Sequence, residues 1–274
     1  MKIAQIAVEV YRRHWHDCKS GLGLLKQAED VCGRLGNAVS IRKVNERMID
    51  DLVLDLERDG KSNGTINRRL AALSKMLRHA YRRGYIERLP VIERKKEPEG
   101  RLRWITEQEE TKLLDKLVEM GRSNVAEFCK VLIDTGARTG ELFKLRGKDV
   151  DLDQGMMYLW QTKNGRSRAV PLTRRALEVL KNNKTSDDGL LFDFTQDVLN
   201  HVWRDMKYLI GLGYDKEFIP HCLRHTCASR LVQRGIDIRV VQEWLGHNSI
   251  TTTMRYAKIA PKNLAQARDV LESV

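Results

Sequence analysis

The chain has 274 residues, with 49 Lys and Arg against 37 Asp and Glu, a formal net charge of +12. This length suits one large domain or two ordinary ones, and 42% hydrophobic with 31% charged residues indicates a globular protein, neither disordered nor fibrous. No run approaches the roughly 18 uncharged apolar residues of a membrane span. The basic surplus favours nucleic acid as the partner.

The N-terminal segment and the cysteines indicate where in the cell the protein is located. Glu9 interrupts the short apolar run near the start, and no cleavage-like site follows, so we expect no signal peptide. Five scattered cysteines suit free thiols in a reducing compartment. We therefore expect a cytoplasmic protein with no membrane partner.

The N-terminal third is predicted to be a small helical domain, residues 1–92. Helical periodicity covers 3–15, 22–34 and 45–59. Residues 1–100 hold 21 Lys and Arg against 14 Asp and Glu, so positive charge is denser here than in the rest of the chain.

The most basic segment, NRRLAALSKMLRHAYRRGYIERLP from Asn67, is also predicted to be a helix. Its apolar positions at helical spacing are Leu70, Leu73, Leu77, Ala80 and Tyr81. The cationic candidates for DNA contact on its other faces are Arg68, Arg69, Lys75, Arg78, Arg82 and Arg83. A solvated surface helix would show the same pattern, so both interpretations stay open.

A charged stretch with Pro98 and Gly100, residues 93–103, is predicted to be a linker. The second domain, 104–274, then begins with Thr106 and Glu109, which form a capping-box pattern.

Within the second domain, residues 125–135 are predicted to form a buried helix. Two short strands, 156–160 and 168–172, flank Lys163-Asn164-Gly165, and Asn-Gly between such runs is a hairpin signal. From Thr195 onward the pattern is helical. The predicted fold is mainly α with a small antiparallel β-hairpin or sheet: an all-helical N-terminal domain and a mixed α/β domain.

Several polar residues of the second domain could act together on a phosphodiester: Arg138, Lys163, His221, Arg224, His247 and Tyr256. Two guanidiniums can hold one phosphate and stabilise charge building at phosphorus. A tyrosine can attack phosphorus once nearby cations favour its phenolate, a lysine can protonate the leaving oxygen, and histidines can orient the phosphate. This chemistry is phosphoryl transfer to tyrosine.

The sequence contains no recognised motif for metal or nucleotide chemistry. No Walker loop, dinucleotide loop or HExxH is present. His221, Cys222, His225 and Cys227 do not have zinc-site spacing, so we expect no metal. His225, one helical turn after His221, is interpreted as a packing residue.

Three segments together resemble the tyrosine recombinase (phage integrase) family: ARTGEL at 137–142, TKNGRSRAVPL at 162–172 and PHCLRHTCASRLVQRGIDIRVVQEWLGHNSITTTMRYA at 220–257. The family's paired Arg and Glu fall on Arg138 and Glu141, and its hairpin lysine on Lys163. Its His-x-x-Arg falls on His221 and Arg224. Its second histidine falls on His247 and its nucleophile on Tyr256.

The resemblance implies a reaction and its partners. Family members cleave DNA through a 3′-phosphotyrosyl link and exchange strands through a Holliday junction in a tetramer, without metal or cofactor. It implies a protein that is monomeric when free, core-type inverted DNA sites, and a possible excisionase and host DNA-bending protein. Residues 1–92 would be the core-binding domain and 104–274 the catalytic domain. Because Met1 leads straight into the helical domain, we expect no arm-binding domain.

We expect integration and excision of a mobile element, as in viral genome integration. The alternatives are a chromosome or plasmid resolvase, a type IB topoisomerase-like enzyme and an inactive DNA-binding regulator. The tail after Tyr256 is predicted to be a helix that docks on a neighbouring protomer or on its own domain.

Overall fold

The computed structural model describes residues 1–98, 100, 102–160, 167–259 and 271–272. The chain divides into two compact units, Met1–Gly100 and Arg101–Val274. Each has its own hydrophobic core. No helix among the described residues is long and apolar enough to cross a membrane.

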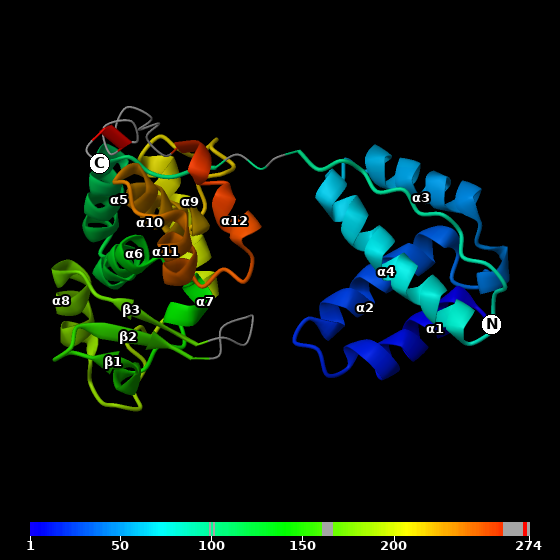
Figure 1. Cartoon of the computed structure of the whole chain (residues 1–274), viewed down its shortest axis with the longest axis horizontal. Helices are drawn as coiled ribbons and strands as arrows, with labels where there is room; N and C mark the ends of the chain where they lie inside the picture. The colour runs from blue at the N-terminus through cyan, green and yellow to red at the C-terminus, as the bar shows by residue number, and fades with distance from the viewer. Residues whose placement is uncertain (99, 101, 161–166, 260–270, 273–274) are drawn as a thin grey trace. The chain divides into compact units, whose positions relative to one another are not determined.

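The first unit is helical wherever it has regular structure of more than one residue. Its helices are listed in chain order: α1 (Ile3–Val10), a π-helical continuation (Tyr11–Trp15), α2 (Gly21–Leu35), a 3₁₀ turn (Ile41–Lys43), α3 (Glu46–Arg58) and α4 (Asn63–Arg82). α4 contacts each of the other three α-helices and runs across the unit (Figure 1). Its apolar face, which includes the fully buried Leu70 and Leu73, therefore lies at the centre of the core.

Two details of α4 differ from the sequence-based expectation. The helix begins at Asn63, because the Ser62 side chain caps its first turn by accepting from the Thr65 amide, 3.3 Å away. Tyr81 was predicted to lie on the buried apolar face. It is 48% exposed, so this prediction was wrong.

Residues predicted as a linker make specific contacts inside each unit. Asn67 on α4 donates to the Lys95 carbonyl at 2.8 Å and accepts from the Lys95 amide at 2.9 Å. At the other end of the stretch, Arg103 donates to Asp215 at 2.9 Å. Both ends are thus held by hydrogen bonds.

The second unit is mainly helical with one small sheet. Its helices are α5 (Glu107–Glu119), α6 (Ser123–Thr135), α7 (Thr139–Leu142), α8 (Arg174–Asn183), α9 (Gln196–Leu209), α10 (His221–Gln233), α11 (Ile238–Leu245) and α12 (Ile250–Met254), with 3₁₀ turns at Gly147–Asp149 and Ala257–Ile259. α10 packs on α6 and α11 and is buried on most of its circumference. The mixed fold class predicted from the sequence is confirmed.

The sheet has the antiparallel order β1-β2-β3 and lies along one edge of the helices (Figure 1). β1 is Val150–Asp151, β2 is Met156–Leu159 and β3 is Arg168–Pro171. Leu159 pairs with Arg168, so β2 and β3 form the predicted hairpin. Its turn, with Lys163, lies outside the described residues. β1, α7 and α8 were not predicted, because two or four residues show no periodicity and α8 is short and highly charged.

The predicted capping box is present at the start of α5. Thr106 accepts from the Glu109 amide at 3.1 Å, and Glu109 accepts from the Thr106 amide at 2.9 Å. These two bonds satisfy amides that a helix N-terminus leaves unpaired.

Replacing Thr106 with Ala should lower the free energy of unfolding of the second unit by about 1 kcal/mol, because one capping bond is lost. Urea unfolding followed by tryptophan fluorescence measures this. Thr111→Ala is the matched control, since the Thr111 hydroxyl only donates to the Glu107 carbonyl within the same helix. Equal midpoints for the two variants would contradict the role of the cap.

Candidate active site

Arg224 lies at the centre of the candidate site and joins two helix ends. It is 2% exposed. From α10 its guanidinium donates to the carbonyl of Gly136, just after α6, and to the carbonyl of Leu245, the last residue of α11, at 2.6 Å. Both acceptors lie at helix C-termini, where the helix dipole favours a cation. The side chain is therefore fixed in place by backbone.

Arg138, the residue directly before α7, reaches into the same site. Gly136 ends α6 in the left-handed conformation, with φ 62°, and turns the chain so that Arg138 precedes the next helix. The Arg138 guanidinium donates to the Gly246 carbonyl at 3.5 Å, beside the carbonyl that Arg224 holds. Two predicted phosphate-binding arginines thus contact adjacent backbone groups.

Glu141 holds Arg138 in position. The Glu141 carboxylate accepts from the Arg138 side chain at 2.7 Å and from its backbone amide at 2.9 Å. It also accepts two bonds from Arg168, at 2.8 and 3.2 Å. Although burial opposes ionisation, these bonds and the charge of Arg168 lower the pKa of Glu141 to about 2.

Arg168 on β3 is a member of this site that sequence reasoning missed. Its side chain is only 7% exposed, and it donates to the Trp244 carbonyl at 3.1 Å as well as to Glu141. Gly246 lies so close that an added Cβ would come within 2.9 Å of the Arg168 side chain. The one available signal was an arginine followed by the apolar Ala169 and Val170 in a short predicted strand.

The arginine cluster has more positive than negative charge. Arg138, Arg168 and Arg224 face the single carboxylate of Glu141, which leaves two positive charges uncompensated among these four groups. Burial, followed by the charges of Arg138 and Arg168, lowers the pKa of Arg224 to about 9. A site of this kind favours an anion such as a phosphodiester.

The two predicted histidines lie around the same arginines. His221 is the exposed first residue of α10. His247 follows the left-handed Gly246, and its Nδ1 lies 2.8 Å from the Thr253 hydroxyl. Burial and then the three arginine charges lower the pKa of His247 to about 3, so this ring is neutral at ordinary pH.

Tyr256 is buried, and its hydroxyl contacts a histidine that we interpreted as packing. The Tyr256 residue is 1% exposed, and its hydroxyl oxygen lies 2.6 Å from Nδ1 of His225. Burial raises the pKa of Tyr256 to about 12 against the opposing effect of Arg224 and Arg255. The nearby cations do favour the phenolate, as expected, but burial outweighs them and the phenol is neutral in this state. His225 contacts the predicted nucleophile, so its interpretation as mere packing is wrong.

The predicted catalytic lysine, Lys163, lies outside the described residues. Its nearest competitor in sequence, Lys148, forms a surface ion pair with Asp188 at 2.7 Å. Tyr158, the competing tyrosine, lies on β2, and its ring stacks on Trp160. No group of His, Cys, Asp and Glu among the described residues could hold a metal ion.

The six predicted DNA-contacting residues, five on α4 and Arg83 directly after it, do not share one environment. Arg68, Arg78, Arg82 and Arg83 are exposed and Lys75 is half-buried. Arg69 instead makes an ion pair with Asp30 on α2. Its predicted role in DNA contact therefore competes with a role in the structure of the unit.

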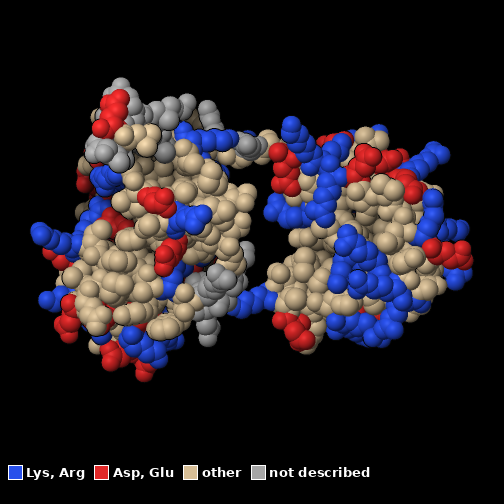
Figure 2. Space-filling view, in the orientation of Figure 1, with Lys and Arg blue, Asp and Glu red and all other residues tan. Residues whose placement is uncertain are grey.

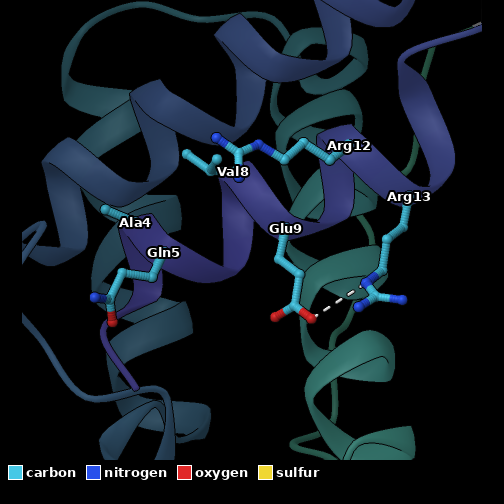
Figure 3. Close-up of a pocket in the computed structure, with 6 residues that line it drawn as sticks. All are labelled: Ala4, Gln5, Val8, Glu9, Arg12 and Arg13. Carbon is cyan, nitrogen blue, oxygen red and sulfur yellow. Dashed lines mark ion pairs between the residues drawn. The ribbon is translucent and has the colours of Figure 1, made fainter.

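Two further arginines, on the continuation of α1, extend this basic surface. Arg12 and Arg13 line a hollow of about 650 Å³ along one side of α1, where Arg13 pairs with Glu9 at 3.3 Å (Figure 3). Burial and the charges of Lys75, His79, Arg82 and Arg13 together lower the pKa of His14. The ends of α1 and α4 thus bring cations close together, and Figure 2 shows Lys and Arg gathered on the visible face of this unit.

The second unit is mainly helical with a small antiparallel sheet. It places a tyrosine beside a cluster of arginines whose positive charge exceeds the negative charge around it. These two features together define the class of the tyrosine recombinases. The chain belongs to the phage integrase family, whose sequence model matches residues 103–263. It is thus an enzyme of a class that cleaves and rejoins DNA strands with a tyrosine nucleophile.

Individual relatives agree with this assignment. The chain is 31% identical to "Tyrosine recombinase XerA" of Pyrococcus furiosus over 169 residues, which is 58% of this chain and 59% of that protein. It is 30% identical to "Tyrosine recombinase XerC" of Thermodesulfovibrio yellowstonii over 84% of this chain and 83% of that protein. Its fold is similar to that of the Tn1549 transposon integrase in complex with a circular intermediate DNA. The TM-score is 0.81 at 19% sequence identity, and the match covers 100% of this chain and 99% of that one.

Replacing Glu141 with Gln should lower the free energy of unfolding by roughly 3 kcal/mol at about pH 7, because the carboxylate is only 8% exposed and pairs with two arginines. Its folded pKa is depressed, so this stabilisation is present above the ordinary pKa of glutamate. It is lost as pH falls toward about 2.

The difference between wild type and Glu141→Gln should therefore shrink when urea unfolding is repeated at about pH 3.5. Glu119→Gln is the control, because Glu119 pairs with Lys116 at an exposed site and should change stability little. A difference that stays constant across this range would contradict ionisation of Glu141 as its source.

Proposed function

We propose that this chain is a site-specific tyrosine recombinase of the integrase type, which cleaves and rejoins DNA through a 3′-phosphotyrosyl intermediate to integrate and excise a mobile element. The observation that carries the proposal is the position of Tyr256. Its hydroxyl lies within a cluster of histidines and arginines that has an excess of positive charge.

The arginines hold the scissile phosphate. Arg138 and Arg224 approach adjacent carbonyls at the end of α11, and each keeps N–H groups beyond those it donates to the protein. Their donors stabilise the charge that develops on the nonbridging oxygens as phosphorus becomes five-coordinate. Because both side chains are fixed by backbone and by Glu141, little reorganisation is needed during the reaction.

The covalent step exchanges one phosphodiester for another. The Tyr256 oxygen forms a bond to phosphorus and loses its proton, while the bond from phosphorus to the 5′ oxygen breaks. We assign Lys163 as the general acid that protonates this leaving oxygen. His221 and His247 donate to the phosphate oxygens. The phosphotyrosine conserves the bond energy, so rejoining by a 5′-hydroxyl needs neither cofactor nor metal.

Strand exchange requires more than one subunit and two duplexes. We propose that a protein that is monomeric in solution assembles as a tetramer on inverted core-type sites and proceeds through a Holliday junction. Residues 1–92 contact DNA as a core-binding domain, joined through 93–103 to the catalytic domain, 104–274. An excisionase and a host DNA-bending protein are the accessory factors that this assignment suggests. The reaction takes place on DNA in the cytoplasm.

A chromosome-resolving recombinase is the second candidate, and the names of the curated relatives favour it. Several of them are called XerA or XerC. The two roles differ in substrate: a resolvase recombines identical sites, whereas an integrase joins two different sites. Reactions with matched and unmatched pairs of sites separate them.

Replacing Tyr256 with Phe should abolish formation of a covalent protein–DNA adduct, because the nucleophilic oxygen is removed. The measurement uses a suicide substrate, nicked DNA from the sequence that flanks the coding region, analysed on a denaturing gel. Duplex binding should stay within about threefold of wild type, since the change removes no formal charge.

Adduct formation by Tyr256→Phe would overturn the assignment of the nucleophile. Tyr158→Phe is the matched control and should cleave normally. Binding without cleavage by the wild type would favour an inactive DNA-binding regulator. Relaxation of supercoiled DNA without any recombination of paired sites would favour a topoisomerase.

Replacing Arg13 and Arg82 together with Gln should weaken DNA binding at all sequences and lower the slope of log K against log salt by about 2, because two phosphate contacts are lost. Fluorescence anisotropy over a range of salt concentrations measures the slope. Arg69→Gln is the contrasting variant: the loss of its ion pair with Asp30 should lower stability and leave the slope unchanged. A reduced slope for Arg69→Gln alone would place the DNA on that side of α4 instead.

A further inference from the structure

His225 is placed to take part in the reaction at Tyr256. Its Nδ1 lies 2.6 Å from the phenolic oxygen, the atom that must lose a proton before or during attack. The two residues are 31 positions apart, on α10 and just after α12, so packing of the helices creates the contact.

The arginines and the other histidines near Tyr256 are poorly suited to accept this proton. Arg224 and Arg255, which bear on its pKa, are cations. His247 has its Nδ1 engaged with the Thr253 hydroxyl at 2.8 Å. His221 meets the ring of His225 edge to face, with ring centroids 4.8 Å apart, whereas the tyrosine hydroxyl contacts His225 itself.

The protonation states on the two sides of this hydrogen bond suit a proton transfer. Burial raises the pKa of Tyr256, so the phenol keeps its proton. Burial, and then electrostatic interactions with His221, Arg255, Arg224 and His247, lower the pKa of His225 to about 3, so the imidazole is neutral. A neutral imidazole nitrogen can accept the hydrogen bond that a phenol donates.

The positive charges of Arg224 and Arg255 near His225 oppose a further positive charge on its ring. A bound phosphodiester adds a negative charge to the cluster and offsets this opposition, so the basicity of His225 rises. Proton transfer thereby depends on the presence of the substrate.

We propose that His225 is the proton acceptor for Tyr256 in the cleavage step. The bond between the Tyr256 oxygen and phosphorus forms as the phenolic proton moves to Nδ1 of His225, which becomes imidazolium. The bond from phosphorus to the 5′ oxygen breaks, and that oxygen takes a proton from the general acid. In rejoining, the imidazolium returns its proton to the departing tyrosine. This inference rests on the proposed function.

The test replaces His225 with Asn, whose amide can still hydrogen-bond near the position of Nδ1 but cannot take up a proton. We expect unchanged DNA binding and thermal stability, and cleavage of the suicide substrate slower by about 10²- to 10⁴-fold. Cleavage by this variant should also rise more steeply with pH than that of wild type, because hydroxide must then remove the phenolic proton. His201→Asn is the matched control, since His201 is exposed on α9 and its Nδ1 hydrogen-bonds the Asp197 carbonyl in its own helix.

A second substrate separates proton transfer from general disruption of the site. A strand ending in a 3′-p-nitrophenyl phosphate can be joined to a 5′-hydroxyl strand without the tyrosine, because its leaving group needs no proton. His225→Asn should join it at the wild-type rate. Arg224→Lys, which loses the fork of donors, should fail at both cleavage and joining.

Each other outcome overturns the proposal. Equal losses in cleavage and joining would make His225 a structural residue. Cleavage at or above the wild-type rate would make the hydrogen bond a restraint on Tyr256 rather than a route for its proton. Absence of an adduct from wild type as well would instead refute the proposed function itself.

Discussion

The buried guanidinium of Arg224 is the interaction on which the rest of the site depends. It donates to the carbonyl that follows α6 and to the last carbonyl of α11, so it replaces solvent as the partner of two helix C-termini. Removing it would leave two buried acceptors unpaired, a cost usually larger than that of losing a surface bond. Folding of this region therefore places a cation at its centre.

Two glycines allow the helices to approach so closely. Gly136 and Gly246 both have left-handed conformations, with φ 62° and 64°. An added Cβ at Gly136 would lie 2.8 Å from the Leu245 side chain, and one at Gly246 would lie 2.9 Å from Arg168. Each glycine thus ends a helix and leaves room for the side chain of another element. The loops that carry Arg138 and His247 are positioned by the same backbone turns that close the core.

The sequence allowed prediction of what is local, and the contacts between distant segments remained hidden. Periodicity and the Thr106–Glu109 pattern located helices and a cap, because their signals lie within a few residues. The contact of Arg224 with Gly136 spans 88 positions, and that of Arg168 with Trp244 spans 76. Arg168 stands out only by its place in a short strand, and His225 shows no distinguishing feature until packing brings Tyr256 to it.

The burial of Tyr256 and the excess of positive charge are two consequences of one arrangement. Desolvation keeps the phenol neutral and the neighbouring imidazoles uncharged, while the arginines are held without enough carboxylates to balance them. The folded chain thereby retains an unfavourable electrostatic energy that an anion relieves. A phosphodiester that enters the cluster supplies the missing negative charge and changes the proton affinities of the groups around it in the same event. Under the proposed function, the electrostatics of the cluster then couple binding to activation.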